Sequence, residues 1–325
     1  MRVELDERRF RFRAPLRTAY GELRERAVLE LRLIEGDVAG VGEAAPLEPY
    51  DGVSIEAVRA ALERCRPLLE DATPHDREEL VDSCWLEAGL PQAVAAVDLA
   101  LWDLEAQRTG VPLAALLGAA PGADVPLSAT IAAIDRAGAA AEAAAATEAG
   151  LRCLKLKVGV GDDAGRLAAV RATVGQDVAL RIDANGAWSV REAVAAIAAL
   201  APVRLELVEE PVHGLDALRA VREQVGVPVV MDETAALPGA PGSGAADGVC
   251  LKLAACGGIT GLLAAAQAAR AIGSFVYVGS TYDGPVGIAA GRAAAAALQP
   301  TPPCGLTTLG LFADGGAEPR SAPRP

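Results

Sequence analysis

The sequence of 325 residues predicts an α/β protein in which a parallel β/α barrel follows a separate α+β domain. Three observations predict this fold. Short apolar strands recur from about residue 124 onward, with starts roughly 20–30 residues apart. An Ala-rich segment that favours helix follows most of them. Residues 1–123 lack this repeat, so they are expected to form a domain of their own.

The first part of the chain predicts a β-meander followed by helices. Residues 1–50 contain the alternating segment VELDERRFRFR and the apolar segment AVLELRLIEG, with Gly turns between strands. Residues 54–118 predict helices, and AVAAVDLALWDLEAQRTG has apolar positions at helical spacing up to Gly110. We expect an α+β domain over residues 1–123, a barrel over 124–310 and a Pro-rich tail over 311–325.

The repeat supplies eight candidate strands, and eight parallel strands suggest a closed barrel. The fifth is followed by TAALPGAPGSGAAD, whose Pro and Gly residues predict a shortened or missing helix. The candidate strands are PLSATIA (126–132), CLKLKV (153–158), ALRIDA (179–184), LELVEEP (205–211), PVVMDE (228–233), GVCLKL (248–253), FVYVGS (275–280) and CGLTTL (304–309).

The composition argues against several classes of partner. Lys and Arg number 30 and Asp and Glu 43, a net charge of −13, which disfavours nucleic acid and anionic membranes. No apolar run of about 18 residues is free of charge or Gly, so no membrane span is expected. The charged, alternating start does not predict a signal peptide. Six scattered cysteines without a CxxC are expected to be reduced, which favours a cytoplasmic protein.

Charged residues lie where such barrels keep their sites, at the carboxyl ends of the strands. Asp183, Glu209 and Asp232 end three successive candidate strands. Converging carboxylates repel one another unless a hard cation lies between them, and carboxylate oxygens suit Mg²⁺. The alternative is three separate ion pairs at the rim of the barrel. Together, on consecutive strands, the carboxylates favour the metal site.

Three lysines accompany these carboxylates. Lys155 and Lys157 share one face of the second strand by alternation, and Lys252 is expected to approach from the opposite side of the barrel mouth. Neighbouring ammonium groups beside a dication lower the pKa of a lysine, which makes it usable as a base.

The segments LKLKVG, RIDANGAW, VEEPV, MDE and CLKLAACGGI, in this order and spacing, resemble the enolase superfamily, muconate-lactonising-enzyme subgroup. The resemblance covers nearly the whole chain and implies a modified TIM barrel with an N-terminal α+β capping domain. It implies Mg²⁺, with Mn²⁺ as an alternative, on Asp183, Glu209 and Asp232. It also implies proton abstraction alpha to a carboxylate with an enediolate intermediate. Lys157 would be the base, Lys155 its electrostatic neighbour, and Lys252 a second acid/base or a cationic stabiliser.

The subgroup holds cycloisomerases, o-succinylbenzoate synthases, N-succinylamino acid racemases and dipeptide epimerases, which share these residues. Dipeptide epimerases usually carry Asp-x-Asp at the eighth strand, where this chain has CGLTTLGLF. That stretch is similar to o-succinylbenzoate synthases. We therefore predict a lyase that dehydrates its substrate to o-succinylbenzoate in menaquinone biosynthesis. The alternatives are a dipeptide or N-acylamino acid epimerase or racemase, and a muconate-type cycloisomerase.

The resemblance also guides the expected substrate contacts. These are Arg181, Ser280 and Asp283 in the barrel and Arg17 and Tyr20 in a capping loop, with Asn185 and Glu233 supporting the metal and the lysines. The expected partner is a small-molecule carboxylate, and the superfamily suggests a homo-oligomer. A non-enzymatic scaffold is the competing hypothesis, but such a protein should have lost the lysines or the carboxylates first.

Overall fold

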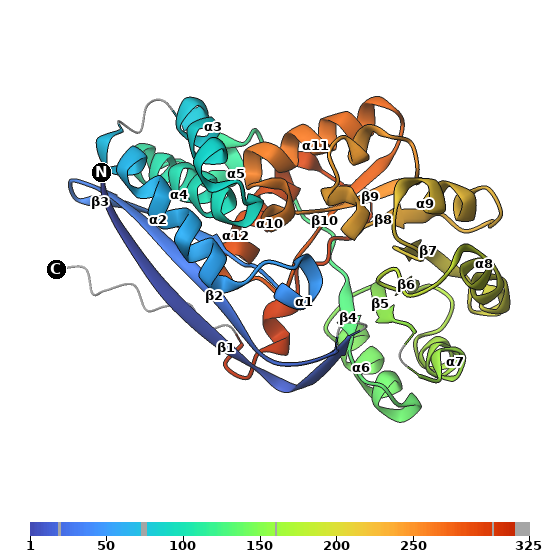
Figure 1. Cartoon of the computed structure of the whole chain (residues 1–325). Coiled ribbons are helices and arrows are strands. Elements are labelled where there is room, and N and C mark those ends of the chain that lie inside the picture. The colour runs from blue at the N-terminus through green and yellow to red at the C-terminus, as the bar shows by residue number, and fades with distance from the viewer. Residues whose placement is uncertain (19–20, 73–76, 160, 301, 316–325) are drawn as a thin grey trace.

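The computed structural model describes residues 1–325 except 19–20, 73–76, 160, 301 and 316–325. Figure 1 shows a long antiparallel sheet with helices beside a second unit, in which parallel strands are surrounded by helices. This α/β architecture is the predicted one. Its second unit is a half-barrel sheet of TIM type, and its first unit, called the cap below, comprises β1–β3 and α1–α5.

The cap sheet is the predicted meander. Its strands are antiparallel in the order β1-β2-β3, and residues Leu29 to Ile34 of the middle strand pair with both neighbours. The cap elements are β1 (Arg2–Thr18), β2 (Gly21–Glu35), β3 (Val38–Ala44), α1 (Glu48–Asp51), α2 (Ile55–Asp71), α3 (Arg77–Ala88), α4 (Pro91–Thr109) and α5 (Leu113–Leu116).

Helix α4 packs directly on strand β3. The helix starts with Pro91 and ends at Gly110, whose φ of 68° gives the left-handed cap that its sequence predicts. Two glycines of β3 permit the close approach. A Cβ on Gly40 would lie 2.1 Å from the carbonyl oxygen of Ala100, and one on Gly42 would lie 1.8 Å from that of Ala96. Only glycine fits at this depth.

The second sheet is parallel, with seven strands in the order β10-β9-β8-β7-β6-β5-β4. Its strands are β4 (Ala129–Ile131), β5 (Cys153–Lys157), β6 (Ala179–Asp183), β7 (Leu205–Glu209), β8 (Val229–Met231), β9 (Gly248–Lys252) and β10 (Phe275–Gly279). Its helices are α6 (Arg136–Glu148), α7 (Asp163–Val174), α8 (Val190–Ala199), α9 (Leu215–Arg222), α10 (Leu253–Cys256), α11 (Ile259–Ala271) and α12 (Pro285–Leu298).

The prediction of an eighth strand over residues 304–309 is wrong, because this segment does not form a regular strand. Cys304 forms one parallel bridge with Leu127, and the N–H of Gly305 donates to the carbonyl oxygen of Val278. This short segment joins β10 to the chain that leads into β4. The 3₁₀-helix η4 (Thr308–Leu311) then turns the backbone away, so the ladder cannot continue.

The predicted loss of the fifth barrel helix is confirmed. Two short 3₁₀-helices, η2 (Glu233–Ala236) and η3 (Ala240–Gly242), occupy the connection between β8 and β9. Another, η1 (Ala201–Val203), precedes β7. The Pro and Gly residues of this connection leave no run long enough for a stable α-helix.

Besides the cores of the cap and the barrel, a third buried cluster joins the two units. Phe10 and Phe12 of β1 pack against Phe312, and Tyr282 contacts Phe12 edge to face. Helix α1 projects from the cap toward the middle of the barrel sheet (Figure 1). The contacts therefore place the cap over one end of the barrel.

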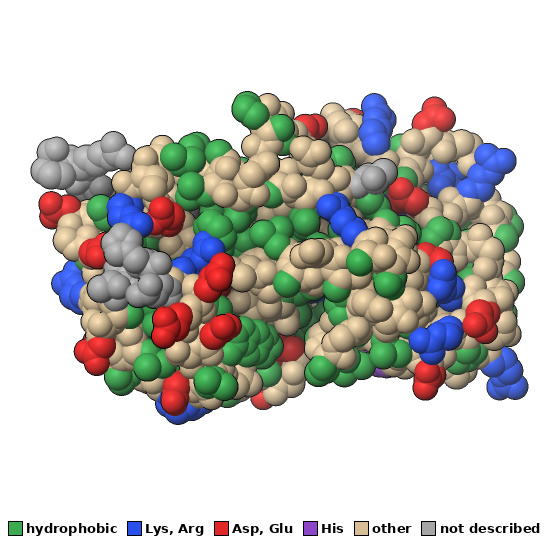
Figure 2. All heavy atoms as spheres, turned by 90° about the horizontal axis from the view of Figure 1, so that it is seen from above, with side chains coloured by type: hydrophobic (Ala, Val, Ile, Leu, Met, Phe, Trp, Pro, Cys, Tyr) green, Lys and Arg blue, Asp and Glu red, His purple; other side chains and the backbone are tan. Residues whose placement is uncertain are grey.

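On the face in Figure 2, acidic and basic side chains occur together toward both ends, and hydrophobic side chains occupy much of the middle. No described helix combines the length and the apolar character needed to cross a membrane. All six cysteines are free thiols, as expected, and five of them are buried.

Candidate active site

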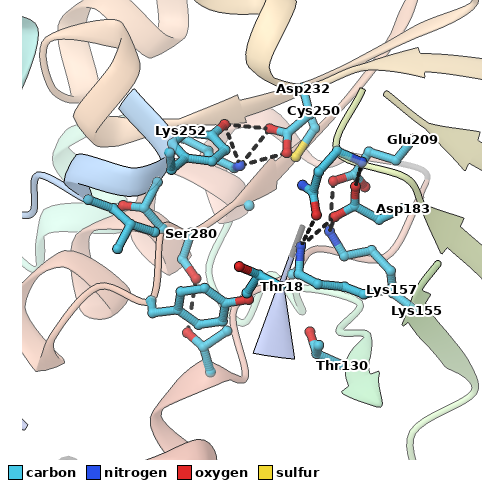
Figure 3. Close-up of a pocket in the computed structure, with 18 of the residues that line it drawn as sticks. Thr18, Thr130, Lys155, Lys157, Asp183, Glu209, Asp232, Cys250, Lys252 and Ser280 are labelled. Carbon is cyan, nitrogen blue, oxygen red and sulfur yellow. Dashed lines mark hydrogen bonds and ion pairs between the residues drawn. The ribbon is translucent and has the colours of Figure 1, made fainter. Parts of the chain in front are cut away.

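Strand register gathers the predicted charged residues at one end of the barrel. Lys157 pairs with Asp183, and Asp183 pairs with Glu209, so these three residues form one row across β5, β6 and β7. Asp232 follows β8, and Lys252 ends β9. All five line one pocket beneath the cap, with Lys157 and Lys252 on opposite sides of it (Figure 3).

On one side of the pocket, two lysines share a carboxylate. The Nζ of Lys155 lies 3.0 Å from Asp183 Oδ2 and 2.7 Å from Glu209 Oε1. The Nζ of Lys157 lies 2.9 Å from the same Asp183 oxygen. Both ammonium groups are largely buried, so their charges are balanced by these carboxylates rather than by water.

On the other side, Lys252 is held by a different carboxylate and by the cap. Its Nζ lies 2.7 Å from Asp232 Oδ2 and donates to the phenol oxygen of Tyr50 at 2.8 Å. The Lys252 ammonium also lies 4.3 Å from the centroid of the Tyr50 ring, within range of a cation–π interaction.

The buried carboxylates respond differently to their neighbours. Burial raises the pKa of Glu209, and it raises the pKa of Asp232 to about 6 although Lys252 opposes this. Burial would also raise the pKa of Asp183, but Lys155 and Lys157 bring it well below its usual range. A divalent cation would relieve the cost of holding Glu209 and Asp232 as anions.

The donor set fits a hard cation. Glu209, Asp232 and Cys250 offer ligand atoms that lie within 4.8 Å of one another. Burial holds the pKa of the Cys250 thiol well above its usual value, so that sulfur remains a neutral and weak ligand. The carboxylate oxygens are therefore the favoured donors, as suits Mg²⁺.

The charges of the protein alone do not produce the low lysine pKa expected from the sequence. Burial would lower the pKa of Lys157, but Asp183 outweighs it and raises that pKa. Burial would also lower the pKa of Lys252, but Asp232 outweighs it and raises that pKa. A lowered lysine pKa would depend on a cation that engages these carboxylates.

Asn185 and Glu233 lie beside the lysines. The Asn185 amide oxygen accepts from Lys157 Nζ at 2.8 Å, and its Nδ2 donates to Glu233 Oε1 at 2.9 Å. Asn185 has a φ of 45°, a left-handed conformation that asparagine tolerates better than most residues. The turn after β6 thus aims the amide at Lys157.

The predicted substrate contacts have different outcomes. Ser280 lines the pocket, where its hydroxyl lies 2.9 Å from that of Thr308. Arg181 also lines the pocket, but its Nε is 2.5 Å from Glu206 and its Nη1 donates to the carbonyl of Pro303. The side chain of Arg17 and all of Tyr20 lie outside the described residues.

The expectation for Asp283 is wrong. Its side chain is buried and is not among the described residues that line the pocket. Its Oδ1 accepts from the backbone N–H of Thr281 at 3.1 Å and from the Thr281 hydroxyl at 2.7 Å. Asp283 therefore stabilises its own turn instead of facing a substrate.

Several pocket residues were not predicted. Tyr277 donates from its hydroxyl to Glu209 Oε2 at 2.6 Å, and Cys250 lies beside Glu209 and Asp232. Both residues lie in apolar strands, which predict core positions. Tyr277 could still have been predicted, because it lies two residues before the end of a barrel strand and so shares a face with that end. Tyr50 gave no local signal, because only the docking of the cap brings it to the pocket.

Two family models match this chain. Residues 2–118 match the mandelate racemase/muconate lactonizing enzyme N-terminal domain, and residues 138–308 match the enolase C-terminal domain-like model. The chain is 35% identical to a hydrophobic dipeptide epimerase of Roseobacter litoralis over 301 residues, which cover 90% of this chain and 86% of the relative.

A solved structure shows the same architecture. It is a dipeptide epimerase from Enterococcus faecalis in complex with Mg and the dipeptide L-Leu-L-Tyr. The TM-score is 0.89 at 28% identity, and the match covers 96% of this chain and 91% of that one.

An o-succinylbenzoate synthase of Mycobacterium tuberculosis is 42% identical over 206 residues, but the match covers only 60% of this chain and 61% of the synthase. Dipeptide epimerases match over more of the chain. The matched models, the relatives and the shared architecture agree on metal-dependent removal of a proton next to a carboxylate. The chain belongs to the mandelate racemase/muconate lactonizing enzyme family of the enolase superfamily, and it is an enzyme.

Proposed function

We propose that this enzyme epimerises hydrophobic dipeptides at the α-carbon next to their free carboxylate. One observation carries the proposal, namely that Lys157 and Lys252 face one pocket from opposite sides (Figure 3). Inversion at carbon needs a proton donor and a proton acceptor on the two faces of that carbon. The similarity to dipeptide epimerases over 90% of the chain supports the same reaction.

The proposed reaction moves one proton across the pocket. Lys157, as the free amine, takes the α-proton from one face and becomes an ammonium. Lys252, as an ammonium, gives a proton to the opposite face and becomes an amine. The reverse reaction exchanges the two roles. Lys155 stays protonated between Asp183 and Glu209, where its positive charge favours the negative charge that develops on the substrate.

Asp183, Glu209 and Asp232 would hold the divalent cation in this proposal. When bound, Mg²⁺ would act as a Lewis acid toward the substrate carboxylate. The chain's own groups orient the ligands. Tyr277 donates to Glu209, and the backbone N–H of Asp232 donates to the carboxylate of Glu210 at 2.7 Å. These contacts fix the carboxylate of Glu209 and the backbone of Asp232 before any ligand binds.

Synthesis of o-succinylbenzoate is the second candidate, and the 42% identity over 206 residues favours it. In that reaction Lys157 would remove one proton and hydroxide would leave, so a base on one face suffices. Lys252 would then act as a cation and not as an acid/base. The two candidates therefore differ in what Lys252 must do.

Deuterium exchange tests the proposal. The enzyme, supplied with Mg²⁺, is incubated in D₂O with L-Leu-L-Tyr, L-Ala-L-Leu and N-acetyl-L-leucine. We expect one deuterium at the carboxylate-bearing α-carbon of the dipeptides, together with the epimer inverted at that carbon. Lys157→Ala and Lys252→Ala should each abolish inversion.

The cyclohexadiene precursor of o-succinylbenzoate is tested in parallel by loss of its absorbance. Turnover of this diene, with no deuterium in either dipeptide, would contradict the epimerase proposal and support the second candidate. Exchange only in N-acetyl-L-leucine would move the substrate class from dipeptides to N-acylamino acids.

A further inference from the structure

The two lysines that face each other across the pocket are each held by a carboxylate and by a neutral oxygen. Lys157 Nζ has Asp183 Oδ2 at 2.9 Å and Asn185 Oδ1 at 2.8 Å. Lys252 Nζ has both oxygens of Asp232, Oδ1 at 2.6 Å and Oδ2 at 2.7 Å, and Tyr50 Oη at 2.8 Å. Each lysine is thus held by one carboxylate of the proposed metal site and by one neutral oxygen.

The neutral oxygens come from different parts of the molecule. Asn185 follows β6 and belongs to the barrel, whereas Tyr50 belongs to α1 of the cap. Tyr50 is separated from Lys252 by 202 positions in the sequence. One lysine is therefore positioned by the barrel alone, and the other depends on a side chain that the cap brings to the pocket.

The turn that carries Tyr50 is fixed within the cap. Asp51 accepts from the backbone N–H of Leu47 at 3.0 Å and from that of Val53 at 2.9 Å. The side-chain amide of Gln92, on α4, donates to the same carboxylate at 2.9 Å. Because α4 packs on the cap sheet, the position of the phenol follows the position of the cap.

The phenol is well placed to orient Lys252. An ammonium group has three N–H donors. Among the described residues, Asp232 and Tyr50 are the hydrogen-bond partners of Lys252 Nζ. The Tyr50 O–H in turn lies 3.3 Å from Asp232 Oδ1, so the phenol bridges the lysine and its carboxylate. Asp232 Oδ1 also lies 2.6 Å from Lys252 Nζ, so both oxygens of the carboxylate and the phenol oxygen lie around the ammonium group.

We propose that Tyr50 is the positioning residue for Lys252, so that docking of the cap completes one of the two acid/base groups. The inference rests on the proposed two-lysine epimerisation. It assigns Tyr50 no contact with the reacting carbon. It makes inversion dependent on the cap, whereas proton removal by Lys157 depends on Asn185 within the barrel.

Separate measurements on the two epimers test the inference. L-Leu-L-Tyr and L-Leu-D-Tyr are incubated with the Mg²⁺-loaded enzyme in D₂O, and the initial loss of the α-proton is followed by NMR. Lys157→Ala and Lys252→Ala show which lysine deprotonates which epimer. Tyr50→Phe keeps the ring and removes only the hydroxyl.

We expect Tyr50→Phe to slow proton removal roughly tenfold or more from the epimer that Lys252 deprotonates, because displacement of a catalytic group costs rate steeply. The other epimer should lose its proton at a rate within about twofold of the wild-type rate. Asn185→Gly is the matched control, since glycine tolerates the φ of 45° at this position. Asn185→Gly should slow proton removal from the epimer that Lys157 deprotonates and leave the rate for the other epimer nearly unchanged.

Equal slowing of both epimers by Tyr50→Phe would overturn the inference, as would no change in either. Tyr50→Leu is the second variant and should show the same one-sided loss, with thermal unfolding of each variant verifying that the chain is folded. A wild-type enzyme that exchanges neither dipeptide would instead contradict the proposed function. The two failures are therefore distinguishable.

Discussion

Glu43 is a buried carboxyl group at the junction of the cap and the barrel. It lies in β3 and is 3% exposed, and its Oε1 accepts from the backbone N–H of Gly284 at 2.7 Å. Burial, followed by repulsion from Asp283, raises the pKa of Glu43 to about 8. Glu43 is thus protonated in the folded protein at neutral pH, although it would ionise in the unfolded chain.

This residue makes stability depend on pH. The folded pKa of Glu43 is above its value of 4.5 in the unfolded chain. Between these values the folded state binds more protons, so stability falls as pH rises from about 5 to 8, by up to about 1.4 kcal/mol per pH unit. We expect Glu43→Gln to flatten this slope, as measured by urea unfolding across that range.

The control for this prediction is Glu56→Gln, which changes an exposed carboxyl in the first turn of α2. It should keep the wild-type slope. Parallel pH profiles for the wild type and Glu43→Gln would show that Glu43 is not the group responsible.

At the scale of elements, the packing of β3 on α4 depends on the absence of side chains. A Cβ at position 42 would lie 1.8 Å from the carbonyl oxygen of Ala96, and this neighbour is helix backbone that cannot rotate away. Replacing Gly by Ala normally stabilises a strand, so any loss of stability on substitution at position 42 must come from this clash.

We expect Gly42→Ala to lower the free energy of unfolding by about 1–3 kcal/mol, the usual cost of overpacking. Urea unfolding measures it. Gly226→Ala is the matched control because a Cβ at Gly226 would meet nothing within 4 Å, so it should change stability by less than about 0.5 kcal/mol. Equal effects of the two substitutions would mean that β3 and α4 are not in close contact.

At the scale of the whole molecule, a bound cation should stabilise the fold because it binds only where the barrel strands converge. Mg²⁺ at about 100 times its dissociation constant would add about 2.7 kcal/mol to the free energy of unfolding. We expect Mg²⁺ to raise the Tm of the wild type, with EDTA reversing the change, and to leave the Tm of Glu209→Gln nearly unaffected.

Glu210→Gln distinguishes the proposed metal site from its neighbour. Glu210, His213 and Glu233 form a second group of potential ligands beside the pocket. If the cation binds Asp183, Glu209 and Asp232, Glu210→Gln should retain the Mg²⁺-dependent rise in Tm. If the Mg²⁺-dependent rise in Tm persists in Glu209→Gln and disappears in Glu210→Gln, the cation binds at the second group instead.

Local patterns in the sequence determined much of this molecule. Alternation predicted the cap meander, the βα repeat predicted the parallel sheet, and Pro and Gly after Glu233 predicted the missing helix. Strand ends also predicted which charged residues meet. Because parallel strands in register align their carboxyl ends, Lys157, Asp183 and Glu209 form one row without further information.

Tertiary structure decided the rest. The segment at Cys304 contributes a single bridge, Asp283 turns inward to Thr281, and Tyr50 reaches Lys252 across 202 positions of sequence. None of these follows from residue type or periodicity, because each depends on how separate segments pack. The residues that meet at the strand ends depend on neighbours along the chain and on the register of adjacent strands. The partner of Lys252 depends instead on the docking of the cap on the barrel.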